Sequence, residues 1–289
     1  MKRRNFLWFS ALFVSSTIFA CSRPATPPAV EVPALRLAIT DISGMKELEA
    51  EYEEFRAALA ATLGTEITFF PVENSAAATV ALKRGEIDLA LAGPSEYVVI
   101  KSRTNAVPIV AITRPNYHSM IVVPADSPLS NIADLKGKTI AMSDIGSTSG
   151  HLGPTSLLLN AGLDPKTDVT VQMLGDEGSV EAIKTGKVDA WGGSAVDYAD
   201  LLKDETGSFV ALVEGPPLPS DVIIASSSLD PATVGLIRER LLAHETTIVT
   251  AIATHTSKYV GSTMQPALDK DYDPIRAVYQ ALGQGEFVQ

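Results

Sequence analysis

The segment Lys138-Thr-Ile-Ala-Met-Ser-Asp-Ile-Gly-Ser147-Thr148-Ser149-Gly150-His-Leu-Gly-Pro-Thr-Ser-Leu-Leu-Leu-Asn160 joins three local signals in one run. A short β-prone run, Thr139 to Met142, is followed by a glycine, three successive hydroxyl residues and a second glycine. A leucine-rich stretch of helical length comes next. The segment therefore predicts a strand, a hydroxyl-rich turn and a helix that begins at that turn.

Two interpretations of Ser147, Thr148 and Ser149 follow from this placement. Serine and threonine lead the N-cap preferences, so the three residues can simply cap the helix. The first turn of a helix also presents backbone N–H groups without intrahelical acceptors, and the helix dipole favours negative charge there. Hydroxyls and free N–H groups together suit a tetrahedral oxyanion. The segment alone supports both interpretations equally.

The rest of the chain alternates short strands with helices. A stripe of apolar residues predicts a helix from Met45 to Leu63, which Gly64 ends. Strands are expected at 35–40, 66–72, 87–92, 107–114, 119–123, 169–173 and 188–192, and helices at 76–84, 95–102, 130–135, 180–185 and over most of the tail from 231. This alternation predicts an α/β fold with mostly parallel sheets.

An internal repeat points to two similar α/β lobes. Ala81-Leu-Lys-Arg-Gly-Glu-Ile-Asp88 matches Ala182-Ile-Lys-Thr-Gly-Lys-Val-Asp189 at a constant offset, and Glu96-Tyr97 falls on Asp197-Tyr198 at the same offset. Each unit reads as a helix, a glycine turn, an aspartate, a strand and then an acidic residue before a tyrosine. We expect the ligand between the two lobes, at the carboxyl ends of the strands.

The N-terminus has the pattern of an export signal. Lys2-Arg3-Arg4 precedes an apolar run from Phe6 to Phe19, and Cys21, the only cysteine, follows Ala20. We expect residues 1–20 to be a signal peptide, and 21–34 a lipidated Cys21 with a proline-rich tether. An ordinary signal peptide with an incidental cysteine is the alternative. The paired arginines leave Sec and twin-arginine export both open.

The mature chain is strongly acidic. Loss of Lys2, Arg3 and Arg4 leaves 20 basic against 34 acidic residues, a net charge of −14. Such a chain is a poor candidate for binding nucleic acid or an anionic membrane, so the lipid is its only expected membrane contact. An anionic ligand would have to be held locally, by backbone dipoles and hydroxyls.

Several of these motifs resemble a known family, the periplasmic solute-binding proteins of phosphonate, phosphite and phosphate ABC transporters. The resemblance runs from about Leu35 to Leu242. It rests on 81–90, Gly93-Pro94-Ser-Glu-Tyr97, Tyr117-His118-Ser119, 134–141, Gly146-Ser-Thr-Ser-Gly150 and Pro216-Pro-Leu-Pro-Ser-Asp221. It implies a two-lobed, type II clamshell without catalytic activity, with hinge crossovers near 114–118 and 213–223. We expect residues 35–116 plus 223–289 in lobe I and 117–222 in lobe II.

The resemblance also implies ligand contacts. Ser147, Thr148 and Ser149 would hold the oxyanion, and Tyr117 and Asp221 match family positions that contact ligand near the hinge. Two positions depart from the family and are equivalent under the repeat. Ser75 stands where the family usually has tyrosine, and Asp176 stands where it usually has histidine.

Asp176 opposes a dianion but can accept a hydrogen bond from a P–OH group or an amine. The sequence supports two roles for Asp176 equally: it may line the ligand site, or it may only cap the following helix. Asp197 and Tyr97, at the ends of the repeated strands, are further ligand-binding candidates. For Asp197 and for Glu96 a solvated rim position is the favoured interpretation, and contact with the ammonium group of a zwitterionic ligand is the alternative.

The sequence thus predicts a lipid-anchored, periplasmic binding protein that delivers a small oxyanion to the permease of an ABC importer. We expect a monomer that needs no cofactor or metal and is not an enzyme, because the chain has no nucleophile elbow, P-loop or metal-ligand spacing. The competing interpretation is a sensor lipoprotein that presents a bound solute, such as a sulfonate or a zwitterion, to a signalling partner.

Overall fold

The computed structural model describes residues 31–202 and 207–288. The expected signal peptide and Cys21 lie outside the described residues. Among those that are described, no helix combines the length and apolar character needed to cross a membrane.

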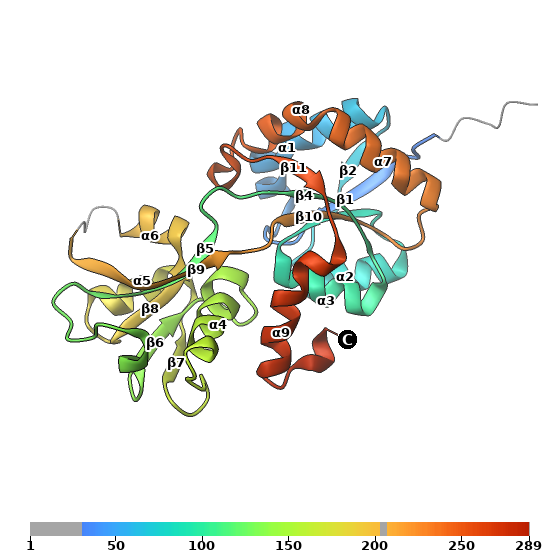
Figure 1. The fold of residues 1–289 in the computed structure, drawn as a ribbon. Coiled ribbons are helices and arrows are strands. Elements are labelled where there is room, and N and C mark those ends of the chain that lie inside the picture. Colours follow the sequence, from blue (N-terminus) through green and yellow to red (C-terminus); the bar gives the residue numbers. More distant parts are fainter. Residues whose placement is uncertain (1–30, 203–206, 289) are drawn as a thin grey trace, which may run out of the picture. The chain divides into compact units, whose positions relative to one another are not determined.

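The strands of the described residues form two separate sheets (Figure 1). The six-stranded sheet has the order β11-β4-β10-β3-β1-β2, and the five-stranded sheet has the order β7-β6-β8-β5-β9. The first comprises β1 (Leu35–Ile39), β2 (Ile67–Phe69), β3 (Leu89–Ala92), β4 (Val107–Ile112), β10 (Asp221–Ala225) and β11 (Met264–Pro266). The second comprises β5 (His118–Pro124), β6 (Thr139–Met142), β7 (Thr170–Met173), β8 (Ala190–Ser194) and β9 (Phe209–Pro217).

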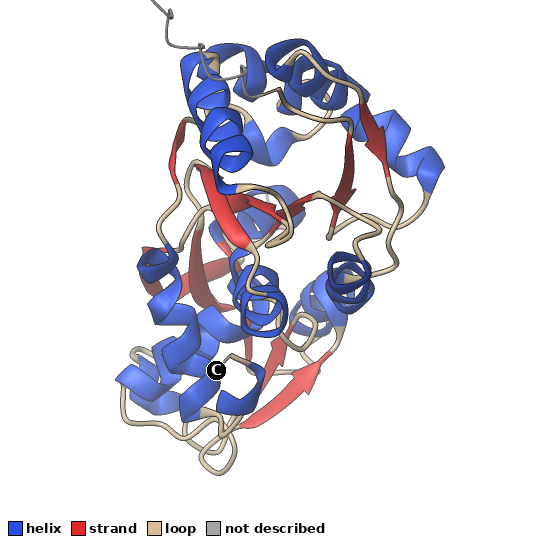
Figure 2. Ribbon diagram, turned by 90° about the vertical axis from the view of Figure 1, so that its right-hand side faces the viewer, coloured by secondary structure: helices blue, strands red, loops and turns tan. Residues whose placement is uncertain are grey.

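Helices lie beside the strands of both sheets (Figure 2). Those of the six-stranded sheet are α1 (Met45–Leu63), α2 (Ser75–Arg84), α3 (Pro94–Thr104), α7 (Pro231–Ala243), α8 (Glu245–Ile252) and α9 (Asp273–Ala281). Those of the five-stranded sheet are α4 (Gly153–Asn160), α5 (Gly175–Lys184) and α6 (Ala195–Leu201). The α1 bounds match the apolar stripe read from the sequence. By contrast, α5 begins five residues before its expected start, so Asp176 lies in its first turn.

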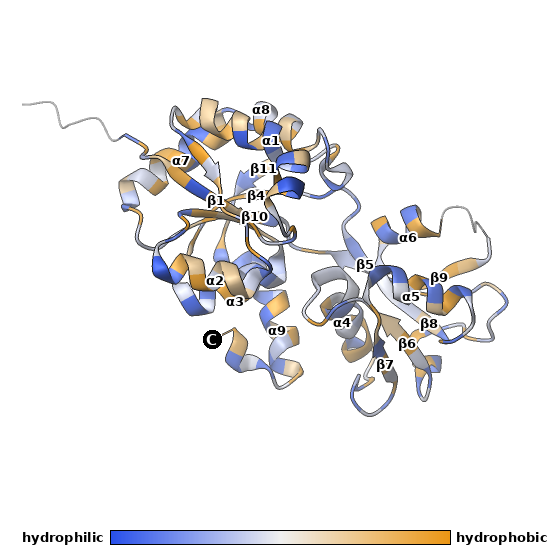
Figure 3. Ribbon diagram, turned by 180° about the vertical axis from the view of Figure 1, so that it is seen from behind, coloured by the Kyte–Doolittle hydropathy of each residue, from blue (hydrophilic) through white to orange (hydrophobic). Residues whose placement is uncertain are grey.

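Strand periodicity divides the core of the six-stranded sheet into two layers. Leu35, Leu37 and Ile39 of β1 pack with α1, α7 and α8, whereas Ala38 packs with α2 and α3 on the opposite face. Successive strand residues point to opposite faces, so one strand serves both layers. The helices that cover this sheet bury one side each, and Figure 3 shows hydrophobic and hydrophilic residues alternating around α1 and α8.

The internal repeat has a structural counterpart. The α2–β3–α3 unit corresponds to α5–β8–α6, and the repeated aspartates make the same bond in each. Asp88 accepts a hydrogen bond from the Arg36 N–H at 2.8 Å, and Asp189 accepts one from the Thr139 N–H at 2.8 Å. Each aspartate thereby joins the start of one strand to its parallel neighbour.

The expectation of mostly parallel sheets is wrong, because both sheets are mixed. β1 pairs in parallel with β2 and β3, and β6 with β7 and β8, whereas β10, β11, β5 and β9 pair antiparallel. Parallel neighbours need a long crossover, usually a helix, and these appear in the sequence pattern. The antiparallel strands β5 and β10 are entered directly from the other sheet, without a helix.

The chain passes between the sheets along two short segments. Residues 113–117 lead from β4 to β5, and residues 218–220 lead from β9 to β10. Both lie where the sequence indicates hinge crossovers. The side chains of Arg114 and Tyr117 and the first residue of β10, Asp221, are therefore held where the two sheets connect.

Candidate ligand-binding site

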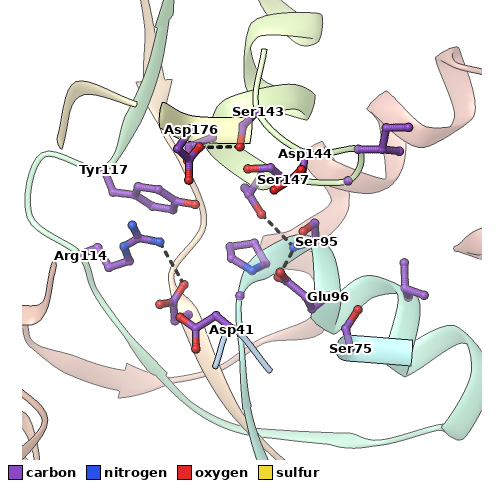
Figure 4. A pocket seen from close by; sticks show the side chains of 18 of the residues that line it. Asp41, Ser75, Ser95, Glu96, Arg114, Tyr117, Ser143, Asp144, Ser147 and Asp176 are labelled. Atoms are coloured by element: carbon purple, nitrogen blue, oxygen red, sulfur yellow. Dashed lines mark hydrogen bonds and ion pairs between the residues drawn. The ribbon is translucent and has the colours of Figure 1, made fainter. Parts of the chain in front are cut away.

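A cavity of about 480 Å³ lies at the carboxyl ends of strands from both sheets (Figure 4). Helix starts and loops that follow β1, β3 and β6 supply much of its wall, as expected for a ligand site in an α/β fold. The lining residues are Asp41, Ser75, Gly93, Pro94, Ser95, Glu96, Val99, Arg114, Tyr117, Ser143, Asp144, Ile145, Gly146, Ser147, Thr148, Ser149, Asp176, Asp221, Lys258 and Tyr279.

The Ser-Thr-Ser segment begins a helix, and it leaves backbone donors free. A π-helical turn, Thr148–Leu152, runs directly into α4. The Ser147 hydroxyl caps this turn by accepting a hydrogen bond from the Gly150 N–H at 3.2 Å. Within the described part of the chain, the N–H groups of Thr148 and Ser149 have no acceptor. One helix start can therefore carry both features: the Ser147 hydroxyl caps it, and the N–H groups of Thr148 and Ser149, the anion cradle, stay free to bind an anion.

The glycines around this segment allow its close packing. A Cβ atom at Gly150 would lie 2.4 Å from the Cβ of Ser143, and one at Gly153 would lie 1.8 Å from the Ser119 Oγ. Gly146 has a φ of +90°, a conformation that favours glycine. The turn can thus lie against β5 and the end of β6 only with these small residues.

A second helix start meets the first. The N–H of Ser95, in the first turn of α3, donates to the Thr148 Oγ1 at 3.1 Å. The positive ends of the two helix dipoles therefore lie near the same cavity. Glu96 folds back toward Gly93, where a Cβ atom would come within 2.4 Å of its Oε2. A carboxylate of the protein thus already lies at the start of α3.

The charged side chains of the cavity are mostly acidic. Lys258 forms an ion pair with Asp41, and Arg114 Nη1 lies 3.8 Å from the Oδ1 of Asp221. The other carboxylates in the lining belong to Glu96, Asp144 and Asp176. Burial, helped by Asp221 and Asp41, raises the pKa of Glu96.

Tyr117 is a buried donor at the first sheet crossing. Its ring centroid lies 3.8 Å from the Arg114 Cζ, in a cation–π contact. Burial raises the pKa of Tyr117 to about 12, so its hydroxyl keeps its proton at neutral pH. Figure 4 shows the ring lying next to the guanidinium group.

Ser75 and Asp176, which the repeat makes equivalent, both line the cavity. Ser75 begins α2, and Asp176 lies in the first turn of α5, the equivalent helix of the repeat. The Asp176 Oδ1 accepts a hydrogen bond from the Ser143 Oγ at 2.5 Å.

Two predicted site residues do not line the cavity. Tyr97 is fully buried on the side of α3 that faces the sheet, and its hydroxyl donates to Asp269 Oδ1 at 2.5 Å. Asp197 lies at the start of α6, where its carboxylate and its N–H bond the Ser194 hydroxyl at 2.5 and 3.0 Å. The repeat motif marks equivalent helix starts, but it does not tell which side chain faces the ligand.

Other lining residues were not assigned from the sequence. One feature of the sequence could have identified Arg114: it lies three residues before Tyr117, within the expected hinge. Lys258 and Tyr279 come from the C-terminal region, where the sequence offers only a helical pattern. Glu96 lines the cavity, although a rim position was the favoured interpretation.

Comparison with known proteins identifies the family. Residues 39–272 match the family model "ABC transporter, phosphonate, periplasmic substrate-binding protein". The chain belongs to this family. It is therefore the extracytoplasmic solute-binding component of an ABC transporter, and the type II, two-lobed α/β fold expected from the sequence is confirmed.

Similar proteins agree with this family. The phosphate-import protein PhnD of Mycolicibacterium smegmatis is 24% identical, over 95% of each chain. The phosphonates-binding periplasmic protein of Escherichia coli is 25% identical, over 78% of this chain and 70% of its own. The structure of PhnD1 from Prochlorococcus marinus with methylphosphonate has a TM-score of 0.66 and 18% identity, covering 87% of this chain and 98% of that one.

His151 links the shape of the cradle to pH. Its Nδ1 accepts a hydrogen bond from the Gly146 N–H at 3.0 Å, which requires that nitrogen to be unprotonated. Burial lowers the pKa of His151 below its usual 6.5. The folded state therefore binds fewer protons than the unfolded state as the pH falls below about 6.5, and stability is lost in that direction.

We expect the free energy of unfolding to fall between pH 7 and pH 5 more steeply in the wild type than in His151→Gln. Urea denaturation at several pH values measures both slopes. Equal slopes would show that the charge on His151 costs nothing in the folded state.

Proposed function

We propose that this protein captures a small phosphorus oxyanion, such as phosphite, a phosphonate or phosphate, and delivers it to the permease of an ABC importer. The free N–H groups of Thr148 and Ser149 carry the proposal. They lie at a helix start in a cavity, where charge-assisted hydrogen bonds to an anion are strong. Import and binding of phosphate or phosphonates by the two relatives favour transport over sensing.

The cavity also suggests what accompanies the oxyanion. Its carboxylates outnumber the cations Arg114 and Lys258, so a fully deprotonated dianion would meet repulsion from most of the charged side chains in the cavity. A ligand that also offers a P–OH or an ammonium group could donate hydrogen bonds to these carboxylates. The oxyanion would be contacted by Ser147, Thr148, Ser149 and Tyr117. The P–OH or ammonium group of the ligand would be contacted by Ser75, Asp176 and Asp221.

Capture would involve closure of two lobes, 35–116 plus 223–289 and 117–222, about the crossings at 113–117 and 218–220. The bond from Ser95 to Thr148 joins the two proposed lobes, as does the bond from Lys166 Nζ to the Leu282 carbonyl at 2.6 Å. Both bonds would form on closure and break on release. Binding would involve no chemical turnover, and the protein would act as a monomer without cofactor, metal or nucleic acid.

Isothermal titration of the purified chain with phosphite, methylphosphonate, 2-aminoethylphosphonate, phosphate and methanesulfonate tests the ligand class. We expect saturable heat with at least one phosphorus oxyanion. Absence of both heat and a thermal shift with every phosphorus compound would contradict the proposed function.

The cradle itself is tested by Ser147→Ala combined with Thr148→Ala. Loss of these hydroxyls should weaken binding of the preferred ligand by about 1–3 kcal/mol, because buried hydrogen bonds to a charged group are lost. Ser130→Ala, in an exposed turn outside the cavity, is the matched control and should leave the affinity unchanged. Unchanged affinity in the double variant would contradict the assignment of these two hydroxyls to the ligand.

We propose further that the mature protein is anchored to the membrane by lipid on Cys21. Cys21→Ser should move the expressed protein from the membrane fraction to the soluble extracytoplasmic fraction, since the lipid on this cysteine would be its only membrane contact. Labelling with a palmitate analogue measures acylation directly. Unlabelled wild-type protein would leave an ordinary cleaved signal as the correct interpretation.

A further inference from the structure

Tyr279 reaches the wall of the cavity from α9, the last α-helix of the described chain. It is 7% exposed, and it is one of the residues that line the cavity. A Cβ atom at Gly146, in the loop that follows β6, would lie 3.4 Å from the Tyr279 hydroxyl. The hydroxyl of a helix that packs on the six-stranded sheet thus lies against the loop that leads to the Ser-Thr-Ser segment of the five-stranded sheet.

This hydroxyl is unpaired. Within the described part of the chain, no group is hydrogen-bonded to it, and it is not one of the unpaired atoms that are sealed from solvent. By contrast, the buried hydroxyls of Tyr97 and Tyr259 each donate to an aspartate, at 2.5 and 2.6 Å. A buried hydroxyl without a partner is unfavourable, so a molecule in the cavity that accepts its hydrogen bond would be stabilised there.

Tyr279 is a hydrogen-bond donor at neutral pH. Burial, together with the negative charge of Glu96, raises the pKa of Tyr279 to about 12, so the hydroxyl keeps its proton. Glu96 does not accept that proton, because its Oε2 is bonded to the Ser95 hydroxyl at 3.2 Å and turned toward Gly93. The proton of Tyr279 therefore remains available to an acceptor inside the cavity.

The anion cradle lies within reach of this hydroxyl. Gly146, which the hydroxyl approaches, precedes Thr148 by two residues, at most about 7 Å of chain. An oxyanion bound at the N–H groups of Thr148 and Ser149 has other oxygens that point away from them, and a hydrogen bond to each oxygen adds about 2.8 Å. One tetrahedral anion would therefore span the distance between the cradle and Tyr279.

The helix that carries Tyr279 also contacts the elements of the five-stranded sheet. Figure 1 shows α9 beside α4. The Leu282 carbonyl, at the C-terminal end of α9, accepts a hydrogen bond from the Lys166 Nζ at 2.6 Å. Val278 and Tyr279 belong to the same buried cluster as Leu152, the last residue of the π-helical turn. A change in the position of one sheet relative to the other would therefore shift α9 against the cradle.

We propose that Tyr279 is a ligand-binding residue: its hydroxyl donates a hydrogen bond to an oxygen of the oxyanion in the cradle, and this bond links α9 to the bound ligand. The proposal rests on the proposed function and gives a role to a helix that the sequence marks only by its helical pattern. In the ligand-free protein, α9 is held to the five-stranded sheet by the contacts of Lys166 and Leu152. The ligand adds a third contact, so α9 is more firmly held when the site is occupied.

Tyr279→Phe removes the hydroxyl and keeps the ring. We expect the dissociation constant of the preferred phosphorus oxyanion to rise about 10- to 100-fold, because a hydrogen bond to a charged group is lost. The ligand-free variant should unfold at the same urea concentration as the wild type or at a higher one, since no hydrogen bond within the protein is lost. Isothermal titration and urea denaturation measure the two quantities.

Tyr198→Phe is the matched control. The Tyr198 hydroxyl donates to the Phe209 carbonyl at 2.9 Å, outside the cavity, so this variant should lose stability and keep its affinity. Wild-type affinity in a folded Tyr279→Phe protein would overturn the inference and leave the proposed function standing. A loss of stability in Tyr279→Phe equal to that in Tyr198→Phe would also overturn it, by assigning the hydroxyl a structural role. If the wild type binds no phosphorus oxyanion, the proposed function fails first.

Amide hydrogen exchange tests the link between the ligand and α9. In the wild type, saturating ligand should slow exchange of the α9 amides more than that of the amides of α7, which does not line the cavity. In Tyr279→Phe, saturated at a correspondingly higher ligand concentration, this additional slowing in α9 should be lost. Equal slowing in both proteins would contradict the link between α9 and the ligand through this bond.

Discussion

The hydrogen bond from the Ser95 N–H to the Thr148 hydroxyl joins the starts of two helices that belong to different sheets. It depends on the topology, because each helix follows a strand whose carboxyl end lies at the cavity. The N–H groups at such positions cannot be satisfied within the helix. Placing two helix starts together therefore concentrates unpaired donors in one cavity, and under the proposed function a bound oxyanion would complete them.

The acidic character of the chain limits how an anion can be held. Of the two cations in the cavity, Lys258 is engaged by Asp41, and Glu96 lies at the start of α3, where an anionic ligand would otherwise be favoured. This leaves the start of the π-helical turn before α4, with Arg114 nearby, as the region where an oxyanion meets donors rather than carboxylates. Binding would thus be local, short-ranged and insensitive to the net charge of the chain.

Local signals in the sequence were enough to predict most of this framework. The apolar stripe gives α1 its observed bounds, the repeat locates equivalent units around β3 and β8, and the glycine-bounded hydroxyl run lies in the cavity. β5 lies at the expected strand 119–123, but its antiparallel pairing could not be foreseen, because no helix precedes it. β10 also follows no helix, and it was not expected as a strand. Side-chain direction was the second limit: Tyr97 follows Glu96 by one position, yet only Glu96 faces the cavity. Lys258 and Tyr279 reach the cavity through tertiary packing, which no local pattern records.

Ser75 and Asp176, at helix starts that the repeat makes equivalent, fit the same division of roles. Asp176 accepts a hydrogen bond from the Ser143 hydroxyl, so this hydroxyl can offer only its acceptor sites to a ligand. Ser75, at the equivalent helix start, places only a small hydroxyl at the cavity wall. Backbone N–H groups thus supply donors on one side, and Asp176, Asp221 and Glu96 supply acceptors around them. A ligand that presents both bare oxygens and acidic hydrogens would satisfy this arrangement, whereas one that presents bare oxygens alone would offer no donor to these carboxylates.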